Sequence, residues 1–130
     1  MLKQGIIKEC ESTWNSPIVC VKKKNTEDIR MCLDFRRLNE ITERPIFPIP
    51  NVDEILDSLG NAQYFSTLDL GNAYYQVELD EASKVKTAFS TRSQQYGFNR
   101  MPFGIAVVPA TFQRLMNRVL GELNWKVAIV

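Results

Sequence analysis

The sequence predicts an α+β domain with an antiparallel sheet and packed helices, because hairpin signals and helical periodicity alternate along the chain. Two pairs of β-branched and aromatic runs are each joined by a short polar turn, which is typical of antiparallel hairpins. The apolar repeat that follows Pro109 is the strongest periodic signal in the sequence. With 130 residues, of which 45% are hydrophobic, the chain is long enough for one domain with a core, and it can also be a piece of a larger domain.

The first sixty residues predict a short helix, a β-hairpin and a second helix. Residues 1–9 are expected to be helical, with their apolar side chains on one side. Residues 18–21 and 29–35 are β-rich and flank a polar turn, although no Asn-Gly turn fixes their register. Prolines at 45, 48 and 50 indicate an extended connector. A helix capped by Asn51 or Asp53 is then expected to run to Leu59 and to end at Gly60.

The second half predicts a strand over residues 64–70, a helical turn over 73–77 and a hairpin of 86–91 with 96–101. Pro109 suits the first turn of a long helix. The apolar stripe of that helix consists of Phe112, Leu115, Met116, Val119, Leu120 and Leu123.

The last residues, 125–130, read as a new apolar strand in which the sequence ends. A natural C-terminal edge strand explains this ending. We favour truncation of a larger domain, because an unfinished strand leaves unpaired backbone groups.

Composition excludes several classes of function. The chain has no histidine, which removes histidine-based zinc sites, Ser-His triads and histidine general bases. The net charge of +1 gives no global indication of nucleic-acid binding, although lysines 22 to 24 form a basic cluster. The three cysteines lack CxxC spacing, and neither a signal peptide nor a membrane span is recognisable. We therefore expect a cytoplasmic or nuclear protein with reduced thiols that is not secreted.

The most specific chemical signal is a carboxylate at the end of the apolar run 64–70. A charge at the end of a strand that reads as buried is costly unless a partner compensates for it. A metal ion is the usual partner where phosphates are the substrate. Asp69 is therefore either a metal ligand or a structural carboxylate whose burial destabilises the fold.

A series of motifs in fixed order surrounds this carboxylate. SPIVCVKKK, IRMCLDFRRLNEIT and FPIPNVDEILDSLGNAQYFSTLDL precede LDLGNAYYQV, KTAFST, MPFG and PATFQRLMNRVL. The series resembles the reverse transcriptases of gypsy-type LTR retrotransposons and, more distantly, of retroviruses, from about Leu2 to Val130. The resemblance implies that residues 1–60 are fingers with the start of the palm, and that residues 61–130 are palm with a returning fingers hairpin. It also implies that the chain stops before a Tyr-x-Asp-Asp hairpin, which supplies two further carboxylates in the family.

The resemblance implies part of an RNA-directed DNA polymerase within a Pol polyprotein, located in the cytoplasm as a virus-like particle or in the nucleus. Such an enzyme adds dNTPs to a primer 3′-OH on an RNA or DNA template by two-metal phosphoryl transfer with Mg²⁺, or Mn²⁺. The alternative is a non-catalytic remnant or host-adopted fragment that at most binds nucleic acid. The isolated chain is expected to be inactive.

The resemblance also assigns roles to individual residues. Asp69 matches the first catalytic aspartate and a metal ligand, and Leu70 would offer its backbone carbonyl to the metal. The dNTP would be bound by Lys23, Arg30, Gly71, Asn72, Ala73, Tyr74, Phe103 and Gly104. Template or nucleotide contacts are assigned to Gln113 and Arg114.

Each role has a simpler structural alternative. Gly71 to Ala73 can form an ordinary tight turn, and Tyr74, Phe103 and Phe112 can be core aromatics, as we expect for Tyr75. Lysine runs and exposed helix faces are most often only solvated. One position departs from the family, because Val107 stands where gypsy-type enzymes usually have an asparagine, which puts a template-side contact in doubt.

Overall fold

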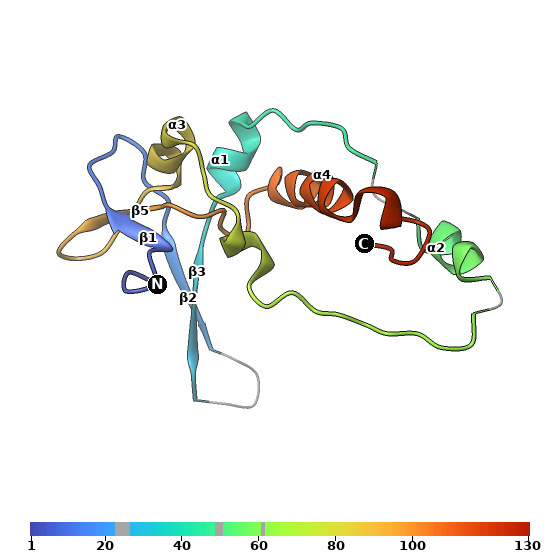
Figure 1. The fold of residues 1–130 in the computed structure, drawn as a ribbon. Helices are drawn as coiled ribbons and strands as arrows, with labels where there is room; N and C mark the ends of the chain where they lie inside the picture. Colours follow the sequence, from blue (N-terminus) through green and yellow to red (C-terminus); the bar gives the residue numbers. More distant parts are fainter. Residues whose placement is uncertain (23–26, 49–50, 61) are drawn as a thin grey trace.

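The computed structural model describes residues 1–22, 27–48, 51–60 and 62–130 (Figure 1). Its larger sheet has three antiparallel strands in the order β1-β5-β4. These are β1 (Ile7–Glu9), β4 (Phe89–Ser90) and β5 (Gln95–Phe98). The hairpin expected between 86 and 101 is confirmed, with strands shorter than expected.

The helix predicted over residues 1–9 is wrong. The chain turns at Gly5, whose φ is +67°, and then forms β1, in which Ile7 pairs with Phe98 and Glu9 with Tyr96. Pairing with a distant strand outweighs the local helical pattern here, because the ladder satisfies the backbone groups of residues 7–9.

A separate two-stranded hairpin consists of β2 (Ile18–Lys22) and β3 (Ile29–Leu33), paired from Ile18 with Leu33 to Lys22 with Ile29. This hairpin is confirmed, and it projects from the body in Figure 1. Lys23, in the connection between the strands, lies outside the described residues.

Both long helices start as their sequences predict. In α2 (Val52–Leu59), the Asn51 side chain accepts a hydrogen bond from the Asp53 amide, and the helix ends at Gly60. In α4 (Val108–Leu120), Pro109 occupies the first turn, where its missing N–H costs nothing. The helical turn after residue 72 is also confirmed, as the 3₁₀ helix η1 (Ala73–Gln76).

Four shorter elements were not predicted from the sequence. They are α1 (Arg36–Ile41), α3 (Glu81–Lys84) and the 3₁₀ helices η2 (Val85–Thr87) and η3 (Gly121–Leu123). Asp80 caps α3 by accepting a hydrogen bond from the Ser83 amide at 3.0 Å.

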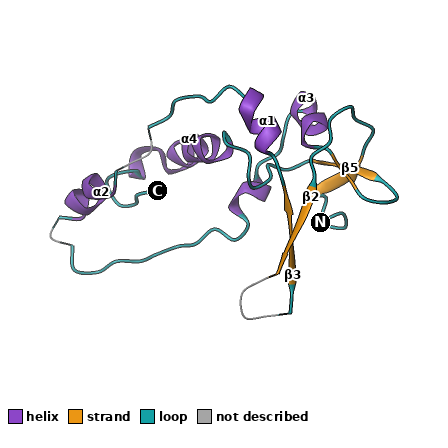
Figure 2. Cartoon of the chain, turned by 180° about the vertical axis from the view of Figure 1, so that it is seen from behind, coloured by secondary structure: helices purple, strands orange, loops and turns teal. Residues whose placement is uncertain are grey.

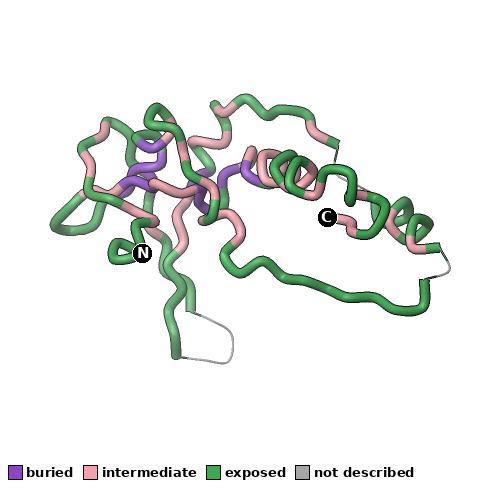
Figure 3. The backbone as a smooth tube through the Cα atoms, in the orientation of Figure 1, coloured by how far each residue is buried: buried purple, intermediate pink, exposed green. Residues whose placement is uncertain are grey.

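The core lies where β4, β5, α1 and the start of α4 meet (Figure 3). Phe98 is its centre, with ring centroids 5.7 Å from Phe89 and 6.5 Å from Phe35. Contacts at these separations bury large apolar surfaces, which is the main stabilising contribution available to a chain of this size. The buried cluster consists of Phe35, Phe89, Phe98, Met101, Ile105 and Val108.

The two strands predicted over 64–70 and 125–130 are wrong. Residues 64–70 form an exposed loop (Figure 2), in which the side chains of Tyr64 and Leu68 are more than nine-tenths accessible. Residues 125–127 form a turn, Ala128 forms one isolated bridge with Asn124, and residues 129–130 have no regular structure. A β-rich segment becomes a strand only when a neighbour pairs with it, and no strand within the described residues pairs with either segment. None of the helices in the described part of the chain is both long and apolar enough to span a membrane.

Candidate nucleotide site

Arg30, Phe103 and Gly104 line one pocket of about 390 Å³, which we call the Arg30–Phe103 pocket. Arg30 comes from β3, whereas Phe103 and Gly104 come from the segment of residues 101–108 that leads into α4. We call residues 101–108 the strap. Three residues predicted to contact the nucleotide therefore converge from segments that lie far apart in the sequence. Tyr75 and Phe98 form part of the same lining.

Two tyrosines of η1 pack against Phe103. The ring centroid of Tyr74 lies 4.8 Å from that of Phe103 and 5.3 Å from that of Phe112. The ring of Tyr75 lies 5.2 Å from Phe103, edge to face, and stacks on Phe98 at 6.3 Å. Burial raises the pKa of the Tyr75 phenol, so this group is neutral at physiological pH. Tyr75 is a packing residue, as predicted, and Tyr74 is a half-buried wall beside Phe103.

The residues between Asp69 and η1 form a tight turn. Asn72 adopts a left-handed conformation with φ of +53°, and its carbonyl accepts a hydrogen bond from the Tyr75 amide at 2.9 Å. The Gln76 side chain donates to the Gly71 carbonyl at 3.2 Å. These bonds explain the turn by local geometry alone, so the triphosphate contacts of Gly71, Asn72 and Ala73 stay a prediction.

Asp69 and Leu70 belong to the exposed loop and not to the lining of the Arg30–Phe103 pocket. Within the described residues, no three His, Cys, Asp or Glu side chains are close enough together to hold a metal ion. Mg²⁺ prefers six oxygen ligands, and one carboxylate with one carbonyl supplies too few. The described residues therefore do not form a complete magnesium site.

Gln113 and Arg114 lie on α4, away from the pocket lining. The Gln113 amide donates to Asn117 Oδ1 at 3.3 Å and also to the backbone carbonyl of Val130. The Arg114 guanidinium lies 5.4 Å from the ring centroid of Phe47, in a cation–π contact. Both side chains thus have partners inside the chain, and their template contacts stay predictions.

The two valines before Pro109 have an apolar role. Val108 is 2% exposed and belongs to the core, and Val107 packs against that core. No side chain caps the start of α4. The departure from the family at Val107 therefore exchanges a potential cap for apolar packing.

A charged pair stands at the start of α1. The Arg36 guanidinium donates to both carboxylate oxygens of Asp34, with the shortest contact at 2.6 Å. The Arg36 side chain, followed by the Arg36 backbone amide, lowers the pKa of Asp34 to about 2. Asp34 therefore stays ionised throughout the physiological range and stabilises the junction between β3 and α1.

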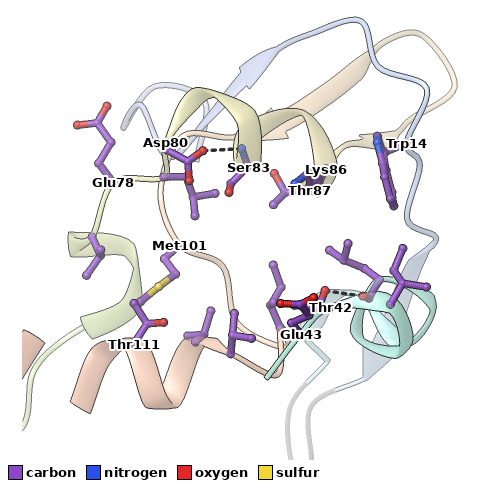
Figure 4. A pocket seen from close by; sticks show the side chains of 17 residues that line it. Trp14, Thr42, Glu43, Glu78, Asp80, Ser83, Lys86, Thr87, Met101 and Thr111 are labelled. Carbon is purple, nitrogen blue, oxygen red and sulfur yellow. Dashed lines mark hydrogen bonds between the residues drawn. The ribbon is translucent and has the colours of Figure 1, made fainter. Parts of the chain in front are cut away.

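A second, mostly apolar cavity of about 510 Å³ is lined by α1, α3, the strap and Trp14 (Figure 4). The strap supplies Met101, Ile105, Val107 and Val108 to this cavity, whereas Pro102, Phe103 and Gly104 line the Arg30–Phe103 pocket. One short segment therefore borders both hollows. A change in the position of the strap changes the shape of both.

Sequence reasoning missed Asn39, whose side-chain amide on α1 bonds twice to the strap. Asn39 lies within the motif IRMCLDFRRLNEIT, but the motif does not indicate its role, because its partners are backbone groups 65 and 67 residues away.

The hairpins β2–β3 and β4–β5, the turn at residues 71–76 and the long helix α4 are arranged as in the fingers–palm unit of a template-directed polymerase. The structure is similar to the foamy viral protease-reverse transcriptase in complex with double-stranded DNA, with a TM-score of 0.84 and 29% identity over 99% of this chain and 23% of that one. It is also similar to the prototype foamy virus protease-reverse transcriptase, with a TM-score of 0.82 and 31% identity over 95% of this chain and 16% of that one.

Residues 21–130 match the family described as reverse transcriptase (RNA-dependent DNA polymerase), and the chain belongs to that family. It is 50% identical over 134 aligned residues to the retrovirus-related Pol polyprotein from transposon 297 of Drosophila melanogaster, and 41% identical over 135 residues to that from transposon gypsy. The chain spans 13% of the length of each of these relatives.

Proposed function

We propose that the chain is the fingers and partial palm of a retroelement RNA-directed DNA polymerase. Its part in the reaction is to hold the incoming dNTP beside the primer 3′-OH. The observation that supports this proposal most is the convergence of Arg30, Phe103 and Gly104 on one pocket, with Tyr74 against Phe103.

The chemistry of these groups suits a deoxynucleoside triphosphate. A guanidinium bonds phosphate oxygens through two parallel N–H donors, so Arg30 would hold the triphosphate. The ring of Phe103 would contact the sugar and base by van der Waals packing, and Tyr74 would occupy the space that a ribose 2′-hydroxyl needs. Lys23, outside the described residues, is proposed as a second cation for the triphosphate.

The metal site would be completed only in a longer protein. Asp69 and the Leu70 carbonyl would provide two oxygen ligands to Mg²⁺ or Mn²⁺, and the remainder of the Pol polyprotein would provide the others. Because the described residues do not form a complete site, we expect no nucleotide incorporation by residues 1–130 alone.

The test is primer extension on an RNA template by the reverse transcriptase of the parent polyprotein. The parent should incorporate dNTPs, and Asp69→Asn should reduce incorporation by at least about a thousandfold, because a neutral amide binds a divalent cation far less well than a carboxylate. Asp57→Asn is the matched control, since Asp57 is an exposed carboxylate on α2 outside the Arg30–Phe103 pocket. Undiminished incorporation by Asp69→Asn refutes the assignment of Asp69.

The second candidate function is a non-catalytic remnant that binds a nucleic-acid backbone through charge. The observation that favours it is that Asp69 is exposed and belongs to no group of three His, Cys, Asp or Glu side chains among the described residues. If the chain has this function, it should bind RNA in a salt-dependent manner, and the reverse transcriptase of the parent polyprotein should incorporate no dNTPs.

A further inference from the structure

Asn39 joins α1 to the strap through both ends of its side-chain amide. Its Nδ2 donates to the Gly104 carbonyl at 2.9 Å, and its Oδ1 accepts from the Ala106 amide at 2.8 Å. One backbone acceptor and one backbone donor, two residues apart, require a side chain that carries both functions. Aspartate can satisfy only the Ala106 amide at neutral pH, and leucine, which has a similar shape, can satisfy neither.

The strap needs such support at this point, because Gly104 has a φ of +93°, which L side chains rarely adopt. A Cβ on Gly104 would lie 3.6 Å from the Phe35 ring, so the turn also approaches the core closely. The Ile105 carbonyl accepts from the Val108 amide at 3.1 Å, which continues the turn into α4. The Asn39 bonds are the ones that tie this turn to α1.

The position of the strap in turn determines the shape of the Arg30–Phe103 pocket. Phe103 and Gly104 are pocket residues, and Gly104 is itself bonded to Asn39. The ring of Phe103 is held on its other flank by Tyr74 and Tyr75. The distance between the Phe103 ring and Arg30 across the pocket thus depends on where the Asn39 bonds place the backbone of residues 104–106.

We propose that Asn39 is a positioning residue for the incoming nucleotide, acting through the strap and not by contact with the substrate. This inference rests on the proposed function. Loss of the two hydrogen bonds should raise the KM for dNTP and leave the affinity for template–primer nearly unchanged, because the strap borders the nucleotide pocket.

The experiment compares Asn39→Leu, Asn39→Asp and Asn99→Leu in the reverse transcriptase of the parent polyprotein. Asn99 is the matched control, since its side chain donates one hydrogen bond to the Gly5 carbonyl at 3.2 Å and lies outside the pocket lining. The measurements are dNTP KM, kcat, template–primer Kd, melting temperature and deuterium exchange of peptides that span residues 101–108.

Asn39→Leu should raise the dNTP KM by about fivefold to thirtyfold and accelerate exchange in the strap, as expected for two lost hydrogen bonds. Asn39→Asp, which keeps the bond to Ala106, should fall between the parent and Asn39→Leu. Asn99→Leu, which loses one exposed hydrogen bond, should change the melting temperature little and keep the dNTP KM within about twofold of the parent value.

A dNTP KM for Asn39→Leu within twofold of the parent value overturns the proposal. An equal rise in KM for Asn99→Leu also overturns it, because the effect would then not be specific to the bonds between Asn39 and the strap. An inactive parent refutes the proposed function together with the nucleotide part of this inference. Unchanged strap exchange in Asn39→Leu refutes the structural part by itself.

Discussion

The residues that line the Arg30–Phe103 pocket and the carboxylate proposed to be catalytic lie in two regions that differ in packing. The body, which comprises residues 1–22, 27–42 and 73–108, contains every buried side chain in the described part of the chain. The outlying region, α2 and residues 62–72, contains none, and Figure 3 shows it as almost entirely exposed. Arg30, Phe103 and Gly104 belong to the body, and Asp69 belongs to the outlying region. The chain thus holds the residues proposed to contact the nucleotide more firmly than it holds the Asp69 carboxylate.

The sharpest way to break this comparison is to remove one large apolar side chain from each region. Phe98→Ala should lower the free energy of unfolding by about 3–5 kcal/mol, because Phe98 is 2% exposed at the centre of the core. Leu68→Ala should change it by less than about 0.5 kcal/mol, because Leu68 is 92% exposed. Urea denaturation followed by circular dichroism measures both. Similar losses for the two variants would contradict the division into two regions.

Within the body, loss of a buried hydrogen bond should destabilise the fold more than loss of an exposed one, although less than loss of a core side chain. The hydroxyl of Thr87 accepts from the Phe98 amide at 2.9 Å and donates to the Lys84 carbonyl at 2.7 Å, and Thr87 is buried. Thr87→Val leaves the Phe98 amide without its acceptor and should lower the free energy of unfolding by about 1–3 kcal/mol.

The exposed Thr91 hydroxyl, which donates to the Gln94 carbonyl at 2.9 Å, provides the matched control. Because water can replace its bonds, Thr91→Val should cost less than about 0.5 kcal/mol in the same urea experiment. Equal costs for the two variants would show that Thr87 is not sealed from solvent.

The smallest expected effect is the pH dependence of stability that arises from the Asp34 carboxyl group. The pKa of Asp34 is about 2 in the folded chain and about 4 when unfolded, so its pairing with Arg36 stabilises the fold fully above about pH 4. That contribution is lost as the pH falls from about 4 to about 2, because the unfolded chain binds the proton first.

Melting temperatures of the unsubstituted chain and of its Asp34→Asn variant, measured between pH 5 and pH 2, test this effect. The difference between the two proteins should shrink as the pH falls. A constant difference over that range would mean that Asp34 acts through its neutral contacts with α1.

Local signals in the sequence predicted the elements whose causes are local. Asn51 caps α2 and Pro109 opens α4, as their neighbouring residues indicate. The same signals failed for α1, where no side-chain cap marks the start at Phe35. They also failed for residues 64–70, because β-propensity describes a side chain's fit to a sheet and cannot supply the neighbouring strand.

The site was predictable only in part, for the same reason. The motif series identified Arg30, Phe103 and Gly104 individually, and their convergence on one pocket is a tertiary fact. Asn39 escaped notice because its partners are the backbone groups of Gly104 and Ala106, which carry no side-chain signature.

The pairing of β1 with β5 has a consequence for synthesis on the ribosome. The Asn99 side chain bonds to Gly5 across 94 residues, and Ile7 pairs with Phe98 beside it. Since translation proceeds from the N-terminus, Ile7–Glu9 leaves the exit tunnel long before β5 exists. Residues 7–9 therefore lack their partner strand in the nascent chain until β5 has been synthesised, and their strand edge stays unpaired for that time. The three-stranded sheet can close only after residue 98 has emerged.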